Sequence, residues 1–149
     1  MTDVRLRDVE DGDLDAFYRH QADPEAAQMA AFPARDRDTF DAHWSKIRAD
    51  GSVTIRTVEA DGQVAGNIGS WTADGRRLVG YSFGREHWGR GIATAALTQL
   101  LTEIPARPIY AYVAAHNAGS IRVLSKCGFR PETKQTGPDG VEEYVYVLT

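Results

Sequence analysis

The sequence has almost no cysteine and no long apolar run. A single cysteine among 149 residues, Cys127, has no partner for an intrachain disulfide, so we expect a reducing, cytoplasmic compartment. Charged residues are scattered through the first dozen positions, and no stretch approaches the roughly eighteen apolar residues of a membrane span. Neither a secretory signal nor a membrane partner is therefore expected. The four histidines show no H-x-x-x-H or cysteine spacing typical of metal sites, so no metal is predicted.

The chain also lacks a basic surplus. Its formal net charge is −4 and no basic stripe is interleaved with aromatics, so nucleic acid is not expected as a partner. The charge is unevenly divided, because residues 1–50 hold 12 acidic and 7 basic side chains whereas residues 85–134 hold 3 acidic and 7 basic ones. The second segment therefore suits a small anionic ligand, and the first favours a cationic partner.

No repeat, low-complexity tract or Gly/Ser linker divides the sequence, so residues 1–149 are expected to form a single domain. With 42% hydrophobic and 26% charged residues, the composition is that of an ordinary soluble globular domain. A chain of this length buries roughly 68–70% of its unfolded surface on folding. A core of normal size is therefore expected.

The hydrophobic pattern switches between the periods of strands and helices. Expected strands cover residues 4–8, 52–59, 64–71, 78–83, 109–114, 129–136 and 141–148. Expected helices are one that begins after Asp11 or Asp13, a short one within residues 23–37, and longer ones over about residues 39–50, 91–103 and 120–126. Turns at Asp61-Gly62 and Asp74-Gly75 make the central strands an antiparallel meander, and a turn over residues 137–140 joins the last two strands. This order predicts a mixed α/β fold, not a doubly wound parallel sheet.

The segment from Tyr81 to Thr94 carries the clearest chemical signal. A strand runs into a loop with two glycines, Gly89 and Gly91, and then directly into a helix. Such a junction directs unpaired backbone N–H groups toward one point, which suits phosphate. Glycine is needed there because a Cβ would block the approach of the ligand or forbid the backbone dihedrals. Arg90 adds a positive charge beside the loop.

Three phosphate-binding patterns compete for this loop. A Walker loop fails because the chain has no Gly-Lys pair. A dinucleotide fingerprint is disfavoured because its third glycine would fall at Thr94 and the preceding strands form a meander. The third pattern, [Q/R]-x-x-G-x-[G/A], fits Gly91-Ile92-Ala93 with Trp88 in its first position.

A second motif begins 24 residues after Ala93 and reads Asn-Ala-Gly-Ser-Ile-Arg-Val-Leu-Ser-Lys-Cys-Gly-Phe over residues 117–129. Together with Trp-Gly-Arg-Gly-Ile-Ala-Thr at residues 88–94, and with the order of elements, it resembles the GNAT superfamily of acetyl-coenzyme A dependent N-acetyltransferases, in its RimJ/RimL-like branch. The sequence departs from many members at Trp88, where Gln or Arg is common. It also departs at Leu124, where a tyrosine is common.

The resemblance implies one GNAT-like domain with a mostly antiparallel central sheet of six to seven strands, flanking helices, and a fourth and fifth strand splayed into a V-shaped slot. It implies acetyl-coenzyme A as cosubstrate and no metal. The implied cofactor-binding residues are Ser82, Phe83, Trp88, Gly89, Arg90, Gly91, Ile92, Ala93, Thr94, Asn117, Ser120 and Lys126. In this mapping Asn117 holds the pantetheine arm, Ser120 caps its helix and contacts the cofactor, and Lys126 approaches the adenosine phosphates. Trp88 is expected to pack beneath the glycine loop.

The implied activity is transfer of acetyl to a primary amine, either a protein N-terminus or a small molecule, by direct attack in a ternary complex. The acidic first segment favours a cationic acceptor. A noncatalytic acyl-coenzyme A sensor or interaction module on the same fold is the alternative. Monomer and homodimer both stay open.

The catalytic groups are predicted from what amine attack requires. The amine must be neutral, and deprotonating a lysine at pH 7 costs about 4.6 kcal/mol, against about 1 kcal/mol for an α-amine. Glu59 and His116 are the candidate bases. Because Leu124 occupies the position of the usual tyrosine acid, Tyr81, Tyr112 or water is expected to protonate the departing thiolate.

Overall fold

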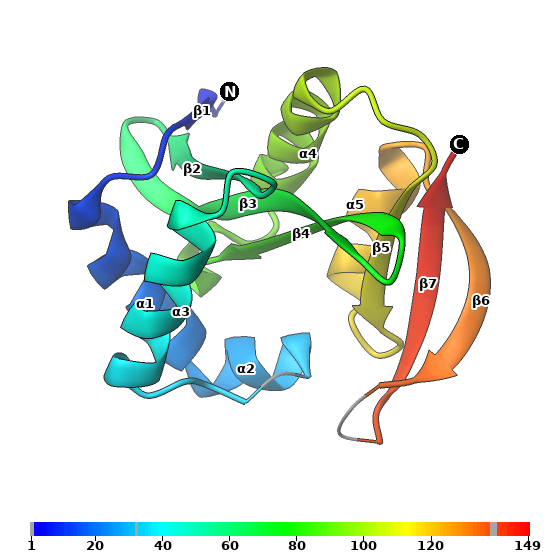
Figure 1. Cartoon of the computed structure of the whole chain (residues 1–149), viewed down its shortest axis with the longest axis horizontal. Coiled ribbons are helices and arrows are strands. Elements are labelled where there is room, and N and C mark those ends of the chain that lie inside the picture. The colour runs from blue at the N-terminus through cyan, green and yellow to red at the C-terminus, as the bar shows by residue number, and fades with distance from the viewer. Residues whose placement is uncertain (1, 32, 138–139) are drawn as a thin grey trace.

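A seven-stranded sheet forms the centre of the molecule (Figure 1). The computed structural model describes residues 2–31, 33–137 and 140–149. Its strands are β1 (Val4–Arg7), β2 (Thr54–Ala60), β3 (Gln63–Ala73), β4 (Arg76–Phe83), β5 (Ile109–Ala114), β6 (Arg130–Thr136) and β7 (Glu142–Leu148). They lie in the order β1-β2-β3-β4-β5-β7-β6, and β4 with β5 is the parallel pair in this otherwise antiparallel sheet. The predicted mixed α/β fold is confirmed.

The helices form two groups beside the sheet. They are α1 (Leu14–Ala22), α2 (Pro24–Ala30), α3 (Arg37–Ala49), α4 (Ile92–Glu103) and α5 (Ala118–Lys126), with 3₁₀ turns η1 (Asp11–Asp13) and η2 (Arg85–His87). In Figure 1 α1, α2 and α3 lie together, whereas α4 and α5 lie across β3 and β4 from them. Among the described residues, no helix combines the length and apolar character needed to cross a membrane.

The helix α4 buries one face, as its period predicts. The buried side chains are Ile92, Ala96, Leu97 and Leu100. They pack with Leu124 of α5 and with the central strands in the main apolar core. Burying one such leucine or isoleucine contributes about 1.5–3 kcal/mol. This packing fixes the start of α4 against the sheet, and with it the loop that precedes the helix.

Both predicted turns of the meander are present. Asp61 and Asp74 each have a φ of 52°, and the glycines that follow them, Gly62 and Gly75, have φ of 80° and 74°. Each pair therefore occupies the left-handed region that tight hairpin turns between twisted strands require. The turn expected over residues 137–140 falls partly outside the described residues.

Of the N-terminal helices, α2 lies within its expected range and α3 begins earlier than expected. The short helix α2 begins after Asp23, whose carboxylate accepts a backbone N–H at 3.0 Å, with Pro24 as its first residue. The longer helix α3 begins at Arg37, not near residue 39. The reason is that Asp36 accepts the Thr39 N–H at 2.8 Å, which places Thr39 inside the first turn.

A buried carboxylate, Asp13, ties the first strand to the N-terminal helices. It is 4% exposed and accepts hydrogen bonds from two nitrogens of Arg7, each at 2.8 Å, and from the Thr57 hydroxyl at 2.7 Å. The Nε of Arg7 donates to Glu59 at 2.8 Å. Burial acts to raise the pKa of Asp13, but the hydrogen bonds from Arg7, Thr57 and a backbone N–H outweigh it and lower the pKa to about 2. The fold therefore stabilises the charged form.

We predict that Asp13→Asn lowers the free energy of unfolding at pH 7 by about 3 kcal/mol, because it leaves Arg7 without its buried partner. The thermal midpoint should fall by roughly 6–12 °C. A depressed pKa stabilises the fold above the ordinary pKa of an aspartate, so the difference from wild type should narrow as the pH falls from about 4 toward 2. Calorimetric melts of the wild type and the variant at pH 7 and at pH 2 measure this difference in stability.

Asp11→Asn is the matched control. Asp11 pairs with Arg48 at 2.7 Å, but its side chain is 94% exposed, so its loss should cost less than about 1 kcal/mol. Equal destabilisation by the two variants would contradict a special role for Asp13.

Candidate functional site

The strands β4 and β5 separate almost as soon as they pair. Their ladder consists of Arg77 opposite Ile109 and Leu78 opposite Tyr110. Beyond these pairs residues 79–83 of β4 have no ladder with β5 in the described structure. The predicted splaying of β4 from β5 is therefore confirmed, and the two strands diverge toward the loops that follow them.

The loop after β4 has the backbone form that its glycines predict. Gly89 and Gly91 have φ of 74° and 76°, and a Cβ built on either would meet no atom within 4 Å. Two reasons for glycine were expected, close approach of a ligand and backbone dihedral angles that a Cβ would disfavour. The structure shows the second reason, because both glycines have a left-handed φ. In the described part of the chain, no acceptor takes the backbone N–H groups of residues 89–94. These donors meet the start of α4, where the helix dipole is positive.

Two of the predicted cofactor-binding residues, Arg90 and Lys126, carry a positive charge. Arg90 lies 3.4 Å from the Asp61 carboxylate. Lys126 is exposed at the end of α5, and the Sγ of the next residue, Cys127, lies 3.7 Å from the Thr94 carbonyl oxygen. The end of α5 therefore lies against the first turn of α4.

Arg122 is a further cation that the sequence reasoning missed. It is exposed on α5, and its spacing of four residues from Lys126 places the two on the same helix face. The four-residue spacing of these two cations could have indicated from the sequence that they share a helix face.

Hydrogen bonds at the start of α5 revise one prediction. Asn117 is the N-cap, and its Oδ1 accepts the Ser120 N–H at 3.1 Å. The prediction that Ser120 caps this helix is therefore wrong, because the helix begins two residues earlier. The Ser120 hydroxyl instead lies 2.6 Å from the Tyr81 hydroxyl on β4. This contact joins β4 to α5, and burial raises the pKa of Tyr81 to about 12.

The Trp88 side chain does not pack beneath the loop as expected. Its indole N–H donates to the Phe83 carbonyl at 3.2 Å, but the residue is 39% exposed. Phe83 itself is buried, and Ser82 pairs with Asn67 on β3. The hydrogen bond holds the indole beside the end of β4, with part of the residue accessible to solvent.

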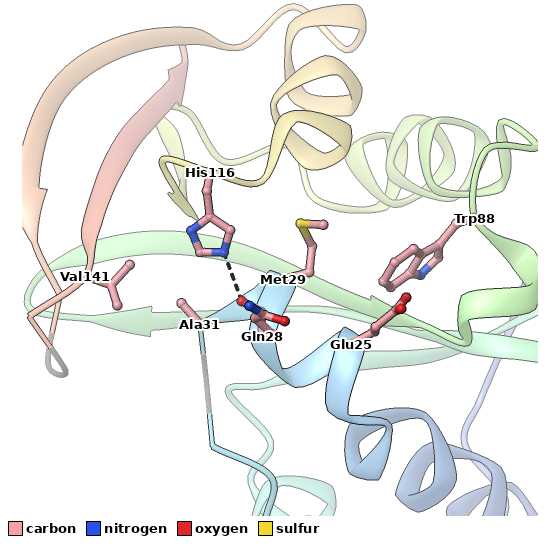
Figure 2. Close-up of a pocket in the computed structure, with 7 residues that line it drawn as sticks. All are labelled: Glu25, Gln28, Met29, Ala31, Trp88, His116 and Val141. Atoms are coloured by element: carbon pink, nitrogen blue, oxygen red, sulfur yellow. Dashed lines mark hydrogen bonds between the residues drawn. The ribbon is translucent and has the colours of Figure 1, made fainter.

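A cavity of about 560 Å³ lies against Trp88. Its lining residues are Glu25, Gln28, Met29, Ala31, Trp88, His116 and Val141 (Figure 2). They come from α2, from the loops after β4 and β5, and from the start of the last strand. The volume is within the range of sites for small ligands.

The two candidate bases occupy different places. His116 lines the cavity, and its Nε2 lies 2.9 Å from the Gln28 carbonyl oxygen. The Glu59 carboxylate is held by Arg7 at 2.8 Å and lines a separate hollow with Asp3 and other residues. The structure thus brings His116 together with Trp88 and leaves Glu59 apart from them.

The short helix expected within residues 23–37 is present as α2, but its individual cavity residues were not predicted from the sequence. Four cavity residues, from Glu25 to Ala31, lie on this helix or at its end. The helix has seven residues and buries none of them, so it has no apolar periodicity. The pair Asp23-Pro24, a capping residue followed by proline at the first helical position, was the available signal.

Comparison with known proteins gives one family. A model described as an acetyltransferase (GNAT) domain matches residues 3–130. The uncharacterized N-acetyltransferase p20 of Bacillus licheniformis is 31% identical over 143 residues, with 87% of this chain and 80% of that protein covered.

Two solved structures show the fold. Spermidine N-acetyltransferase from Vibrio cholerae, in complex with CoA and spermine, is 18% identical with a TM-score of 0.84, covering 97% of this chain and 94% of that chain. RimL, a ribosomal alpha-N-protein acetyltransferase in complex with coenzyme A, is 15% identical with a TM-score of 0.81, covering 97% and 93%.

We predict that Gly91→Val weakens coenzyme A binding at least about tenfold, since a side chain in the left-handed region costs roughly 1–2 kcal/mol and the loop would relax away from its present form. Isothermal titration calorimetry measures the Kd. Gly51→Val is the control, because Gly51 lies in open space with φ outside the left-handed region. Unchanged affinity in Gly91→Val would contradict the assignment of this loop.

Proposed function

The chain belongs to the GNAT family of acetyl-coenzyme A dependent N-acetyltransferases, and from that premise we propose that it acetylates a cationic primary amine bound in the cavity beside α2. The observation that supports this acceptor class is the cavity lining, in which the Glu25 carboxylate and the Trp88 indole border one space. The amine attacks the thioester directly while both substrates are bound.

The proposed position of coenzyme A follows from unsatisfied donors. The backbone N–H groups of residues 89–94 have no acceptor in the described chain, so a pyrophosphate would supply acceptors where the helix dipole also favours negative charge. Arg122 and Lys126 lie on the neighbouring helix face and would approach the remaining phosphate. From there the pantetheine arm would run into the slot between β4 and β5, whose open backbone edges suit an extended amide chain.

The proposed position of the acceptor follows from charge. Figure 2 shows the Glu25 carboxylate beside the Trp88 indole. A carboxylate attracts an ammonium group, and an indole face adds about 0.5–1 kcal/mol through its quadrupole. Glu25 also pairs with Arg85 at 2.8 Å, which holds it at the edge of the cavity. An α-amine and a small-molecule amine both satisfy this arrangement.

The proposed acid is Tyr81. Leu124, at the position where many family members have a tyrosine, is 1% exposed in the apolar core, so it supplies no proton. Burial raises the pKa of Tyr81 to about 12, which keeps its hydroxyl protonated at neutral pH. As the carbon–sulfur bond breaks, the hydroxyl would transfer its proton to the thiolate, with the Ser120 hydroxyl as its hydrogen-bond partner.

A panel of amines and N-terminal peptides tests the acceptor class through amine-dependent release of free thiol. We expect turnover with cationic amines, and we predict that Glu25→Gln raises their KM about fivefold with little change in kcat, because an exposed charge contributes up to about 1 kcal/mol. The KM difference should shrink at high salt, where charges are screened.

Glu132→Gln is the control for Glu25→Gln, since Glu132 lies on β6 outside the cavity lining. Equal KM values for cationic and neutral amines in the wild type would contradict the cationic class. Absence of thiol release with every amine would contradict an amine acceptor altogether.

We predict that Tyr81→Phe lowers kcat about 100-fold, the lower end of what general acid catalysis contributes, while coenzyme A affinity stays within about threefold. Tyr112→Phe should be neutral, because Tyr112 is 40% exposed and its hydroxyl contacts Arg76 at the start of β4, away from Ser120. Stopped-flow measurement of thiol release gives kcat, and a drop shared by both variants would argue against a specific role for Tyr81.

A further inference from the structure

The geometry points to His116 as the general base that deprotonates the acceptor amine, held in one tautomer by the main chain of α2. The inference rests on the proposed function, because it names the residue that acts on the amine in the same cavity. It assigns α2 a second role besides lining the cavity, that of positioning the base through the Gln28 carbonyl.

The cavity itself narrows the choice of base. Among its lining residues, Glu25 and His116 are the titratable ones. Glu25 is already paired with Arg85 at 2.8 Å, whereas His116 faces no cation in the described structure. The nearby start of β7 carries Glu142, whose carboxylate pairs with Lys134 at 3.0 Å. The ion pair with Arg85 fixes Glu25 at the edge of the cavity, where its charge can attract a cation, whereas the imidazole of His116 has one ring nitrogen with no partner among the described residues.

The other histidines do not reach this space. His20 and His87 are each 6% exposed, and the Nδ1 atom of each is buried without a hydrogen-bond partner. Burial lowers the pKa of His20, and neither residue lines the cavity. His43 lies on α3 and is also absent from the lining.

The hydrogen bond to Gln28 fixes which nitrogen of His116 can act as the base. A carbonyl oxygen only accepts hydrogen bonds, so the Nε2 atom at 2.9 Å must carry the proton and donate it. In the neutral ring Nδ1 then has the free lone pair. Figure 2 shows this second nitrogen on the side of the ring turned toward Val141 and away from Glu25 and Trp88. The reacting amine would therefore lie between His116 and Val141, while a second cationic group of the acceptor reaches Glu25. No described residue donates a hydrogen bond to the Nδ1 atom.

This arrangement lets α2 contact the acceptor and orient the base at the same time. The helix buries no residue and is joined to its surroundings by polar contacts, including Arg85 with Asp23 at 3.1 Å. At its other end the Gln28 carbonyl meets His116. An acceptor that fits against α2 thus binds to the same element that orients the base, which couples acceptor fit to base position.

The proposed step balances in protons and bonds. The Nδ1 atom of His116 takes one proton from the ammonium and leaves a neutral amine, whose nitrogen forms a bond to the acetyl carbon as the carbon–sulfur bond breaks. The thiolate takes its proton from Tyr81, and the second proton lost by the amine nitrogen passes to the tyrosinate and restores Tyr81. The imidazolium releases its proton to solvent after the amide has left, since His116 is exposed.

The test is His116→Gln, assayed by thiol release with amines of graded pKa. A glutamine amide can still donate to the Gln28 carbonyl but has no basic nitrogen, so the contact with α2 is preserved while the base is lost. We expect kcat/KM to fall about 100-fold for amines of high pKa and less for amines of low pKa, because general base catalysis contributes about 100-fold or more. Coenzyme A affinity should not change.

Two further readouts separate a base from a structural residue. The limb of the kcat/KM profile that rises with pH should move or vanish in His116→Gln, and added imidazole should restore part of the activity of His116→Ala. His43→Gln is the matched control and should behave as the wild type. A purely structural residue would lower the rate equally for all amines and would not respond to imidazole.

The outcomes distinguish this inference from the proposed function. If the wild type turns over amines and His116→Gln keeps its kcat/KM and pH profile, the base assignment is overturned and the proposed function stands. If the wild type releases no thiol with any amine, the proposed function fails and the base assignment fails with it.

Discussion

The short parallel pairing of β4 with β5 is the constraint on which the rest of the site depends. Two residue pairs join the strands before they diverge, so one edge of β4 faces a slot instead of a neighbouring strand. Backbone donors and acceptors at such an edge need partners, and an extended ligand can provide them. The same divergence separates the two following loops, one with the glycines before α4 and the other with His116 and Asn117. The cavity lies between these loops.

The elements around this cavity are held by different forces. Outside its lining, α4 and α5 bury Leu97, Leu124 and their neighbours in the main core, and apolar burial fixes both helices firmly. Within the lining, α2 buries no residue and makes polar contacts with Arg85 and His116. Exposed ion pairs contribute little stability. The helix α2 is therefore the element that adjusts at the lower energetic cost, while α4 and α5 stay fixed.

Elements with a one-sided apolar period could be predicted from the sequence, because burial on one face dictates that period. The helix over α4 is the clearest example, and Gly91 marks its start because a left-handed φ there excludes most side chains. The short helix α2 has no buried face, so the sequence predicted it only as a short helix somewhere within residues 23–37 and not by an apolar period. The cap of α5 was misplaced because Asn117 and Ser120 are both good capping residues, and only the hydrogen bond between them shows which one acts.

The sequence by itself determined the family and the glycine-dependent form of the loop before α4, because both depend on residue types at short, fixed spacings along the backbone. Only the tertiary structure separated the candidate bases. Glu59 is bound by Arg7 across 52 positions of the sequence, and His116 meets the Gln28 carbonyl across 88 positions. Such partners come together through the order and curvature of the sheet, and no local pattern specifies them. The availability of a basic nitrogen at the slot is therefore a property of the folded chain.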